Sequence, residues 1–423
     1  MLQEVSLGQR SLADYTHLVG RGLVEQIREA AEPLRGARVL HVSATAFGGG
    51  VSEILYTLVP LMRDVGLDAH WHVILGREEF FNVTKLMHNS LQGDPQEITD
   101  QQWEVFLGYN EMNARGLEAD WDVVIIHDPQ PAAMRQHALD RAKRWIWRCH
   151  IDLSTPNPST LERLKPFVEG YDATVWHMQQ YVPQGLERGV NIVPPAIDPL
   201  SPKNMALSPE DAAFVCDQFG IDVDRPLICQ VSRFDPWKDP IGVIDAYRMV
   251  KEEIPDVQLA LVGSMASDDP EGWEFFHKTY RHADNDPDIK ILNNLNNVGA
   301  IEVNAFQSQA DVCVQKSIRE GFGLTVTEAL WKGRPTIAGD VGGIPLQIED
   351  GKTGYLVSSP EECARRSIEV LSDPELGKRL ARAGKEHARE NFLTPRLLRD
   401  WLGLFGDLDV ASELPEARAV EEV

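Results

Sequence analysis

The chain has 423 residues, 43% of them hydrophobic and 25% charged, and its 41 basic and 65 acidic residues give a formal net charge of −24 at pH 7. This length predicts about two domains of roughly 200 residues each, because single hydrophobic cores rarely grow larger. The negative charge argues against nucleic acid as a partner, so any bound phosphate must be held by a local cluster of cations.

The N-terminus and the cysteines predict a cytoplasmic protein without a membrane segment. The stretch MLQEVSLGQRSLADY has no basic region followed by an apolar run, and no apolar stretch approaches membrane-spanning length. The five cysteines are far apart and mostly in apolar surroundings. We interpret them as reduced core residues, since their spacing matches no metal site.

The first half of the chain is predicted to alternate strands and helices. After an N-terminal extension with a helix around 18–31, a glycine turn at 45–50 leads into a helix at 51–65 with apolar residues at helical spacing. Short apolar runs predict strands at 38–43, 69–75, 122–127, 144–150, 173–177 and 191–193. Such runs, separated by helices, are typical of a parallel sheet that is buried on both faces.

The second half repeats this pattern after a proline-rich linker at 194–202. Its strands are predicted at 226–231, 258–262, 289–292, 311–314, 336–338 and 354–357. We therefore predict two doubly wound α/β domains, 1–198 and 199–387, that face a cleft where ligands bind at the carboxyl ends of the strands. The helical tail is too long for one sheet layer, so a last helix at 388–412 is expected to pack back on the first domain.

The most informative stretch is SIREGFGLTVTEAL, residues 317–330. Its glycine loop leads from a strand into a helix, and a helix N-terminus favours bound anions. Glu320 and Glu328 bracket this anion site, and because carboxylates repel phosphate, we predict that they accept hydrogen bonds from nearby hydroxyls. A sugar nucleotide supplies phosphates and hydroxyls together. The alternative is a glycine helix end with two solvated glutamates.

Two other loops are candidates for the same ligand. Arg233 and Lys238 follow the first strand of the second domain, where they would neutralise a leaving diphosphate without a metal. The glycine loop 48–50 follows the first strand of the first domain and opens a helix. Taken alone, the two cations are typical of a solvated surface, and the loop lacks the spaced glycines of a dinucleotide-binding fingerprint.

Polar residues also end strands of the first domain. Asp128 follows one strand, and His150 and Asp152 follow another, where they are either helix caps and structural residues or residues of the cleft. Two Asp-x-Asp pairs, at 222–224 and 286–288, precede strands instead. We interpret these pairs as turn residues rather than as a metal site.

These motifs together resemble a known family. The E-x7-E motif within REGFGLTVTEA, with Arg233 and Lys238 within SRFDPWKD, resembles the signature of retaining glycosyltransferases of family four, which have two Rossmann-like domains in the GT-B fold. More narrowly, EFFNVTKLMHNSLQG, IHDPQP, WRCHIDLSTPN and PPAIDPLSPKN resemble the glycosyltransferring trehalose synthases. Those enzymes transfer glucose reversibly, with retention, from a nucleoside diphosphate glucose to free glucose, giving trehalose and the nucleotide.

The resemblance implies a role for each candidate residue. The catalytic set would be Arg233 and Lys238 on the diphosphate, Glu320 on the glucose hydroxyls and His150 near the glucose 6-hydroxyl. Glu328 would bind the ribose, and two asparagines would line the base pocket. The implied donor-binding residues are Gly48, Gly49, Gly50, Gly321, Phe322, Gly323, Leu324, Thr325, Glu328, Asn294 and Asn297. The acceptor candidates are Asn82, Lys85, His88, Asn89, Gln92, Asp128 and Asp152.

Other functions fit the motifs less well. The nearest alternative is a retaining trehalose phosphorylase, in which phosphate replaces the nucleotide and Glu328 has no ribose to bind. A GT-B-like sugar-nucleotide epimerase leaves the acceptor motifs unexplained, and a catalytically silent sugar-nucleotide sensor would not need the leaving-group chemistry. The expected partners are the sugar nucleotide, glucose and trehalose, with no membrane. No cofactor or protein-bound metal is expected, while Mg²⁺ assisting the nucleotide and a homodimer are both compatible with the sequence.

Overall fold

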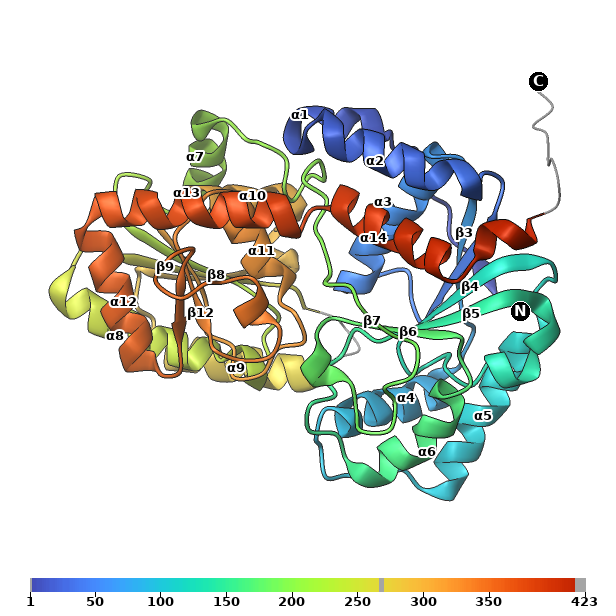
Figure 1. Cartoon of the computed structure of the whole chain (residues 1–423). Helices are drawn as coiled ribbons and strands as arrows, with labels where there is room; N and C mark the ends of the chain where they lie inside the picture. Colours follow the sequence, from blue (N-terminus) through green and yellow to red (C-terminus); the bar gives the residue numbers. More distant parts are fainter. Residues whose placement is uncertain (1, 266–269, 415–423) are drawn as a thin grey trace. The chain divides into compact units, whose positions relative to one another are not determined.

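The computed structural model describes residues 2–265 and 270–414, which divide into two compact units (Figure 1). Unit 1 runs to residue 196 and resumes at residue 394, and unit 2 is Ile197–Leu393. The chain thus passes between units after residues 196 and 393, where the sequence analysis placed the boundaries at 198 and 387. Within the described ranges, every helix is too short or too polar to cross a membrane.

Unit 1 is built on a seven-stranded sheet with the order β1-β3-β2-β4-β5-β6-β7. Only β1 runs antiparallel to its neighbour, and sequence analysis did not foresee this two-residue strand. Because the first long strand, β2, lies between β3 and β4, the order reverses there, and α/β proteins bind ligands at such a point. The strands are β1 (Gln3–Glu4), β2 (Arg38–Ser43), β3 (Asp68–Val73), β4 (Trp121–His127), β5 (Ala142–Arg148), β6 (Ala173–Trp176) and β7 (Val190–Ile192).

Helices cover both faces of this sheet (Figure 1). They are α1 (Thr16–Val19), α2 (Arg21–Ala31), α3 (Gly50–Asp64), α4 (Glu78–Leu91), α5 (Asp100–Arg115), α6 (Pro158–Val168) and α14 (Thr394–Asp407). On one face α14 packs against α2 and α3, and on the other α4 packs against α5 and α6. The predicted helix at 18–31 is interrupted at Gly20, whose φ of 83° lies outside the helical region.

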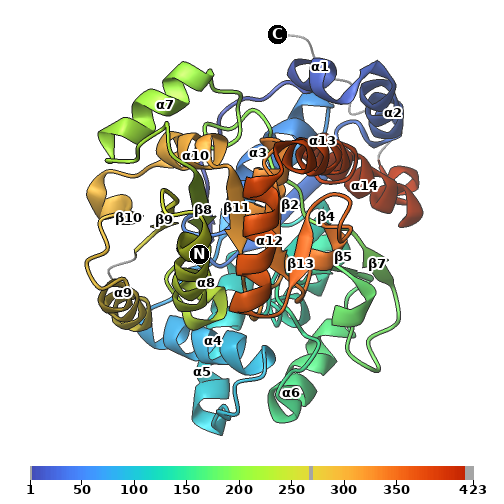
Figure 2. The ribbon, with the colours of Figure 1, turned by 90° about the vertical axis from the view of Figure 1, so that its left-hand side faces the viewer.

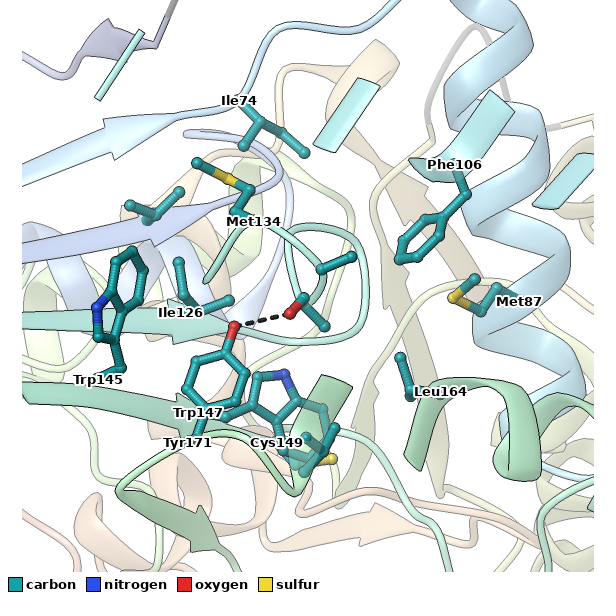
Figure 3. Packing of buried hydrophobic residues seen from close by; sticks show 14 of the residues in the cluster. Ile74, Met87, Phe106, Ile126, Met134, Trp145, Trp147, Cys149, Leu164 and Tyr171 are labelled. Carbon is teal, nitrogen blue, oxygen red and sulfur yellow. Dashed lines mark hydrogen bonds between the residues drawn. The ribbon is translucent and has the colours of Figure 1, made fainter. Parts of the chain in front are cut away.

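The core under α4, α5 and α6 is rich in aromatic side chains (Figure 3). Trp145 and Trp147 of β5 are buried with Phe106 of α5, and the buried Tyr171 donates its hydroxyl proton to the carbonyl of Ala132 at 2.8 Å. Burying an aromatic side chain removes about 150–250 Å² from water, so this layer holds the strands firmly. The polar residues that follow these strands are therefore attached to a well-packed part of the sheet.

Unit 2 has a six-stranded parallel sheet with the order β10-β9-β8-β11-β12-β13. The strands are β8 (Leu227–Val231), β9 (Gln258–Gly263), β10 (Ile289–Asn293), β11 (Val312–Gln315), β12 (Thr336–Gly339) and β13 (Tyr355–Val357). The order reverses between β8 and β11. The loops that follow these two strands therefore emerge side by side, and they are the loops with the candidate cations and glutamates.

The helices of unit 2 lie on both faces of the sheet (Figure 2). They are α7 (Pro209–Gln218), α8 (Pro240–Glu253), α9 (Pro270–His282), α10 (Ala300–Gln309), α11 (Leu324–Trp331), α12 (Pro360–Ser372) and α13 (Pro374–Asn391). On one face α8 packs against α9 and α12, and on the other α7 packs against α10. The five cysteines of the chain are buried and unpaired, as the sequence predicts.

The C-terminal segment returns to the first unit, which confirms the predicted crossing. Ile197 pairs with Leu393 at the edge of unit 2, and its N–H donates to the carbonyl of Phe392 at 2.9 Å. Helix α14 then begins at Thr394 rather than at 388, because the helix before it ends at Asn391. In unit 1 the buried Arg396 donates to the carbonyl oxygens of Pro194 at 2.9 Å and Pro195 at 2.8 Å. The last helix is therefore an integral layer of unit 1.

Candidate active site

The predicted anion site lies where β11 passes into α11. Gly323 caps the helix with a φ of 83°, and the helix begins at Leu324 as the sequence predicts. The N–H of Val326 already donates to the carbonyl of Gly323 at 2.9 Å. The N–H groups of Leu324 and Thr325 precede the first helical hydrogen bonds, so they are donors available to an anion.

Two glycines that sequence analysis missed allow the loop to take this path. A β-carbon at Gly339, the last residue of β12, would lie 2.1 Å from the carbonyl oxygen of Ser317. A β-carbon at Gly343 would lie 2.7 Å from the carbonyl oxygen of Gly321. Both distances are shorter than any normal contact, so only glycine fits. The signal in the sequence was the glycine-rich GDVGG that follows the strand at 336–338.

Lys238 and Glu320 meet beside this loop. Lys238 ends a short 3₁₀ turn, and its ammonium donates to Glu320 Oε2 at 2.7 Å. The hydroxyl of Ser317 donates to the same carboxylate oxygen at 3.2 Å. Both partners are largely buried, with 16% and 10% of their side chains exposed. The structure thus brings a cation, a carboxylate and the N-terminus of a helix together.

Arg233 is the most exposed member of the predicted catalytic set. Its side chain is 62% exposed and forms an ion pair of 3.1 Å with Asp235. Asp235 also accepts from the N–H groups of Trp237 at 2.9 Å and Lys238 at 3.1 Å. One carboxylate therefore ties the guanidinium to the turn that presents Lys238.

A buried lysine that sequence analysis missed anchors the start of the glycine loop. Lys316 comes directly after β11 and forms an ion pair with Asp239. Asp239 has a φ of 46°, and its other carboxylate oxygen accepts from the N–H of Gly242 at 3.0 Å at the start of α8. The loops that carry Lys238 and Glu320 are therefore joined at a second point, which limits their relative movement.

Glu328 is fully buried within α11 and lies between lysines. Its Oε1 is 3.0 Å from Nζ of Lys203, which lies in the PPAIDPLSPKN segment. Lys332 is one helical turn further and donates to Asn204 Oδ1 at 3.0 Å. Burial lowers the pKa of the Lys332 ammonium to about 8, although the charge of Glu328 opposes this shift. A diol that binds Glu328 must therefore compete with Lys203. No local sequence pattern predicts the ion pair of Lys203 with Glu328.

Glu328→Gln is expected to raise the dissociation constant of a nucleoside diphosphate about tenfold to hundredfold. Hydrogen bonds to a charged group are worth about 1.5–3 kcal/mol, and glutamine keeps the shape of the side chain while it removes the charge. Isothermal titration calorimetry measures the effect. Glu274→Gln is the matched control, because Glu274 pairs with Lys278 at 2.7 Å on the exposed face of α9. Equal affinities of Glu328→Gln and the unmodified enzyme would contradict the ribose assignment.

The predicted base pocket, the loop after β10, is organised by its own amides. Asn294 Oδ1 accepts from the N–H of Met265 at 2.7 Å, and its Nδ2 donates to the Met265 carbonyl at 3.0 Å. Asn297 adopts a left-handed conformation with a φ of 62° and ends the 3₁₀ turn. The side chain of Asn294 therefore supports the loop, and residues 294–297 are all exposed, among them the hydrophobic Leu295.

In unit 1, three histidines from adjacent strands form a hydrogen-bonded row. Nδ1 of His41 lies 2.9 Å from Nε2 of His127, and Nδ1 of His127 lies 2.9 Å from Nε2 of His150. Burial lowers the pKa of all three imidazoles, to about 3 for His41 and well below the ordinary value for the other two. The rings are thus neutral, and each N–H···N bond fixes the tautomer of the next ring. The row orients His150, and sequence analysis missed its other two members.

Asp128 supports the same histidine through the backbone. Its Oδ1 accepts from the N–H of His150 at 2.7 Å, and its φ of 65° is a left-handed conformation. Burial raises the pKa of the Asp128 carboxyl to about 7, although this hydrogen bond and the charge of Arg148 oppose the shift. Asp152 is buried, and its Oδ1 accepts from the N–H of Ser154 at 2.8 Å. Both aspartates therefore bind N–H groups of the loop after β5, and neither caps a helix, since the N-cap of α6 is Asn157.

His41→Phe is expected to weaken the dependence of the melting temperature on pH. The folded-state pKa of His41 is about 3, below its ordinary 6.5, so unfolding at low pH takes up a proton that the folded state excludes. Its contribution to stability is complete above pH 6.5 and falls toward pH 3, by about 1.4 kcal/mol per pH unit for each such group. Scanning calorimetry across this range measures it. The exposed His137→Phe is the control, and an unchanged slope in His41→Phe would contradict a neutral row.

The remaining predicted residues of unit 1 lie on α4 and in the loop before α3. Asn82 and Lys85 are exposed on α4, and Gln92 is buried just beyond its end. The other two α4 candidates, His88 and Asn89, are half-buried. The predicted loop Gly48-Gly49-Gly50 is exposed, has a φ of 77° at Gly48 and leads directly into α3. This loop also presents the N-terminus of a helix.

Carboxylates of both Asp-x-Asp pairs are bound to lysine, arginine or backbone N–H groups. Asp286 and Asp288 bind the ammonium of Lys251 at 3.0 and 2.8 Å, and Arg225 pairs with Asp288 at 2.7 Å. Asp222 Oδ1 accepts from the N–H of Asp224 at 3.1 Å, a hydrogen bond that is typical of a turn. These contacts agree with the interpretation of both pairs as turn residues.

Comparison with known proteins identifies the class of the chain. The family model described as "Glycosyl transferases group 1" matches residues 214–387. The structure of the trehalose-6-phosphate synthase OtsA aligns with a TM-score of 0.71 at 14% identity, covering 90% of this chain and all of that one. Together with the two mainly parallel sheets, these matches define a glycosyltransferase of the GT-B fold, as the sequence predicts.

A family model that matches unit 1 and the relatives of the whole chain identify the family more narrowly. The model described as "Trehalose synthase, N-terminal domain" matches residues 41–183. The trehalose synthase of Rubrobacter xylanophilus is 58% identical over 96% of this chain and 99% of its own length. The trehalose phosphorylase of Pleurotus pulmonarius is 27% identical, and the match covers 93% of this chain and 60% of that protein. The chain belongs to the trehalose synthase family and is a hexosyltransferase. The phosphorylase alternative is disfavoured.

Proposed function

We propose that the enzyme transfers glucose reversibly from a nucleoside diphosphate glucose to free glucose with retention, giving α,α-trehalose and the nucleoside diphosphate. The observation that carries this proposal is the meeting of Lys238, Glu320 and the start of α11 at the point where the strand order of unit 2 reverses. A cation and helix amides suit the diphosphate, while the carboxylate suits the glucose hydroxyls.

The diphosphate would be bound by positive groups of several kinds. Arg233 offers a two-pronged guanidinium, Lys238 a point charge, and Leu324 and Thr325 backbone N–H groups. The N–H groups of the loop at 48–50 would complete the cradle. Because Lys238 is paired with Glu320 at 2.7 Å, nucleotide binding would exchange part of this ion pair for contacts to phosphate and sugar.

The sugar and ribose hydroxyls would be bound by carboxylates and an imidazole. Glu320 would accept from the glucose hydroxyls near C3 and C4, and Glu328 from the ribose diol in place of Lys203. His150, oriented by the histidine row and by Asp128, would contact the 6-hydroxyl of the donor glucose. The loop 293–297 would meet the base.

Substitution on one face of the donor sugar best explains retention of the configuration at glucose C1. The described residues of this site offer no convincing nucleophile for a double displacement. The bond between glucose C1 and the phosphate oxygen would break as the bond from C1 to O1 of the acceptor glucose forms. The departing phosphate oxygen would take the proton from that acceptor hydroxyl, while Arg233 and Lys238 stabilise the charge on the leaving group.

The acceptor glucose would be bound by groups of unit 1. The candidates are Asn82, Lys85, His88, Asn89, Gln92, Asp128 and Asp152. No cofactor is part of the proposal, and Mg²⁺ would enter only with the nucleotide, because phosphate charge is already met by protein cations.

Incubation of trehalose with either inorganic phosphate or each nucleoside diphosphate tests the function. Mass spectrometry should identify a nucleoside diphosphate glucose formed with the nucleotide and no glucose 1-phosphate formed with phosphate. Glucose 1-phosphate as the sole product would make the enzyme a phosphorylase instead. Binding of the sugar nucleotide with no product in either incubation would favour a sensor.

A further inference from the structure

A cluster of histidine and carboxylate groups lies at the edge of the unit 1 sheet, where β1 pairs with β3. Glu4 is directly opposite His72 in the antiparallel register, and His70 is two residues earlier on the same face of β3. One potential ligand atom from each of these three side chains lies within 4.8 Å of the others. A single ion can therefore contact all three.

The orientation of His70 presents one ring nitrogen to this cluster. Its Nε2 is 2.9 Å from Asp68 Oδ1, and its Nδ1 is 3.1 Å from Glu4 Oε1. If Nε2–H donates to Asp68, the lone pair of Nδ1 faces the carboxylate of Glu4, and two acceptors at this distance repel each other. A cation between them removes the repulsion. A carboxylate that holds the far nitrogen of a histidine is also the usual support of a metal-binding imidazole.

His72 supplies a further polar atom without a partner. Its Nδ1 is buried and has no hydrogen-bond partner among the residues that the structure describes. The ring of Trp121 backs the cluster, with its centroid 5.4 Å from that of His70 and 6.4 Å from that of His72. Two carboxylates, Glu4 and Asp68, face two imidazoles here. Arg38 lies 3.6 Å from Asp68, with its guanidinium carbon 4.4 Å from the centroid of the Trp121 ring.

We propose that Glu4, His70 and His72 bind one divalent transition-metal ion of the Zn²⁺ class, with Asp68 as the support of His70. Two imidazoles and one carboxylate suit such ions better than Mg²⁺ or Ca²⁺, which prefer oxygen ligands. Three protein ligands leave room for water in the remaining coordination positions. The ion would fasten β1, a strand of only two residues, to the sheet edge.

Titration of tag-free, chelator-treated enzyme with ZnCl₂ tests the site. Calorimetry should detect one tight site per chain, and Zn²⁺ should raise the melting temperature of unit 1 because it binds the folded state. Replacing Zn²⁺ with Co²⁺ should give visible absorption bands from nitrogen and oxygen ligation. All three signals are expected without nucleotide or sugar.

Variants separate a metal site from a cluster held by hydrogen bonds alone. Glu4→Gln and His72→Ala are expected to lose at least tenfold in Zn²⁺ affinity, and Asp68→Asn about 10–100-fold. Glu4 is 56% exposed, so its variant should fold normally, and trehalose synthesis by all three reports an intact fold. His17→Ala is the matched control from the same N-terminal segment. Zn²⁺ affinity equal in Glu4→Gln and His17→Ala would overturn the proposal and leave a cluster held by hydrogen bonds alone.

Discussion

Arg233→Ala is expected to lower kcat by about two to three powers of ten while unit 2 stays folded. Removing one preorganised donor that stabilises developing negative charge costs this much in other enzymes. The cost to stability should be small, because the side chain is 62% exposed and its ion pair with Asp235 is solvated. Initial rates in the trehalose-forming direction, at saturating donor and acceptor, measure the loss.

Two further variants make this result specific. Arg389→Ala removes an exposed arginine that also pairs with a carboxylate, Glu386, and it should leave kcat unchanged. Arg233→Lys keeps one positive charge but lacks the two-pronged geometry, so it should recover only part of the rate. Near-normal turnover of Arg233→Ala would refute the assignment of Arg233 to the diphosphate.

Gly339→Ala is expected to abolish measurable nucleotide binding and to lower the melting temperature of unit 2. The added methyl would lie 2.1 Å from the carbonyl oxygen of Ser317, and a backbone atom cannot swing away as a side chain can. Forcing extra atoms into a packed region costs about 1–3 kcal/mol. The backbone that must move carries Glu320, so its contact with Lys238 would be lost. Calorimetry with a nucleoside diphosphate and a thermal melt report the two effects.

A graded series of glycine replacements provides the control. Gly343→Ala meets the Gly321 carbonyl at 2.7 Å and should weaken binding less than Gly339→Ala. Gly377→Ala, within α13, has its nearest neighbour at 3.6 Å and should bind nucleotide normally. If all three variants bound equally well, the loop would not depend on this close approach. If Gly339→Ala failed to fold, the milder Gly343→Ala would still test the same contact.

Much of the fold could be predicted from local patterns in the sequence. Apolar runs between helices placed β2 at its observed bounds and the other long strands within two residues of theirs, because strands buried on both faces need such runs. The last helix was predicted to begin at 388 and begins at 394, and two other elements were wrong or missed. Gly20 splits the first predicted helix, and β1 consists of two exposed polar residues whose only structural signal is their pairing with β3.

Some features of the candidate site could likewise be predicted from the sequence, and others could not. The helix start at Leu324 follows from glycine and helix chemistry, which act over a few residues. The contact of Lys238 with Glu320 joins residues that are 82 apart, and the row from His41 to His150 depends on which strands are neighbours. Likewise, the pairing of Lys203 with Glu328 and the need for glycine at 339 arise from packing between distant segments. Sequence periodicity carries no information about such contacts.

The return of α14 to unit 1 has a consequence for folding during synthesis. All of unit 2 lies between residues 197 and 393, so its sheet and helices can assemble as soon as those residues leave the ribosome. Unit 1 is translated first, yet α2 and α3 lack their covering helix until residues 394–407 emerge. The buried contact of His41 with Trp401, whose ring centroids lie 6.1 Å apart, therefore forms only after residues 394–407 have emerged. Unit 1 therefore begins to be made before unit 2 and is completed after it.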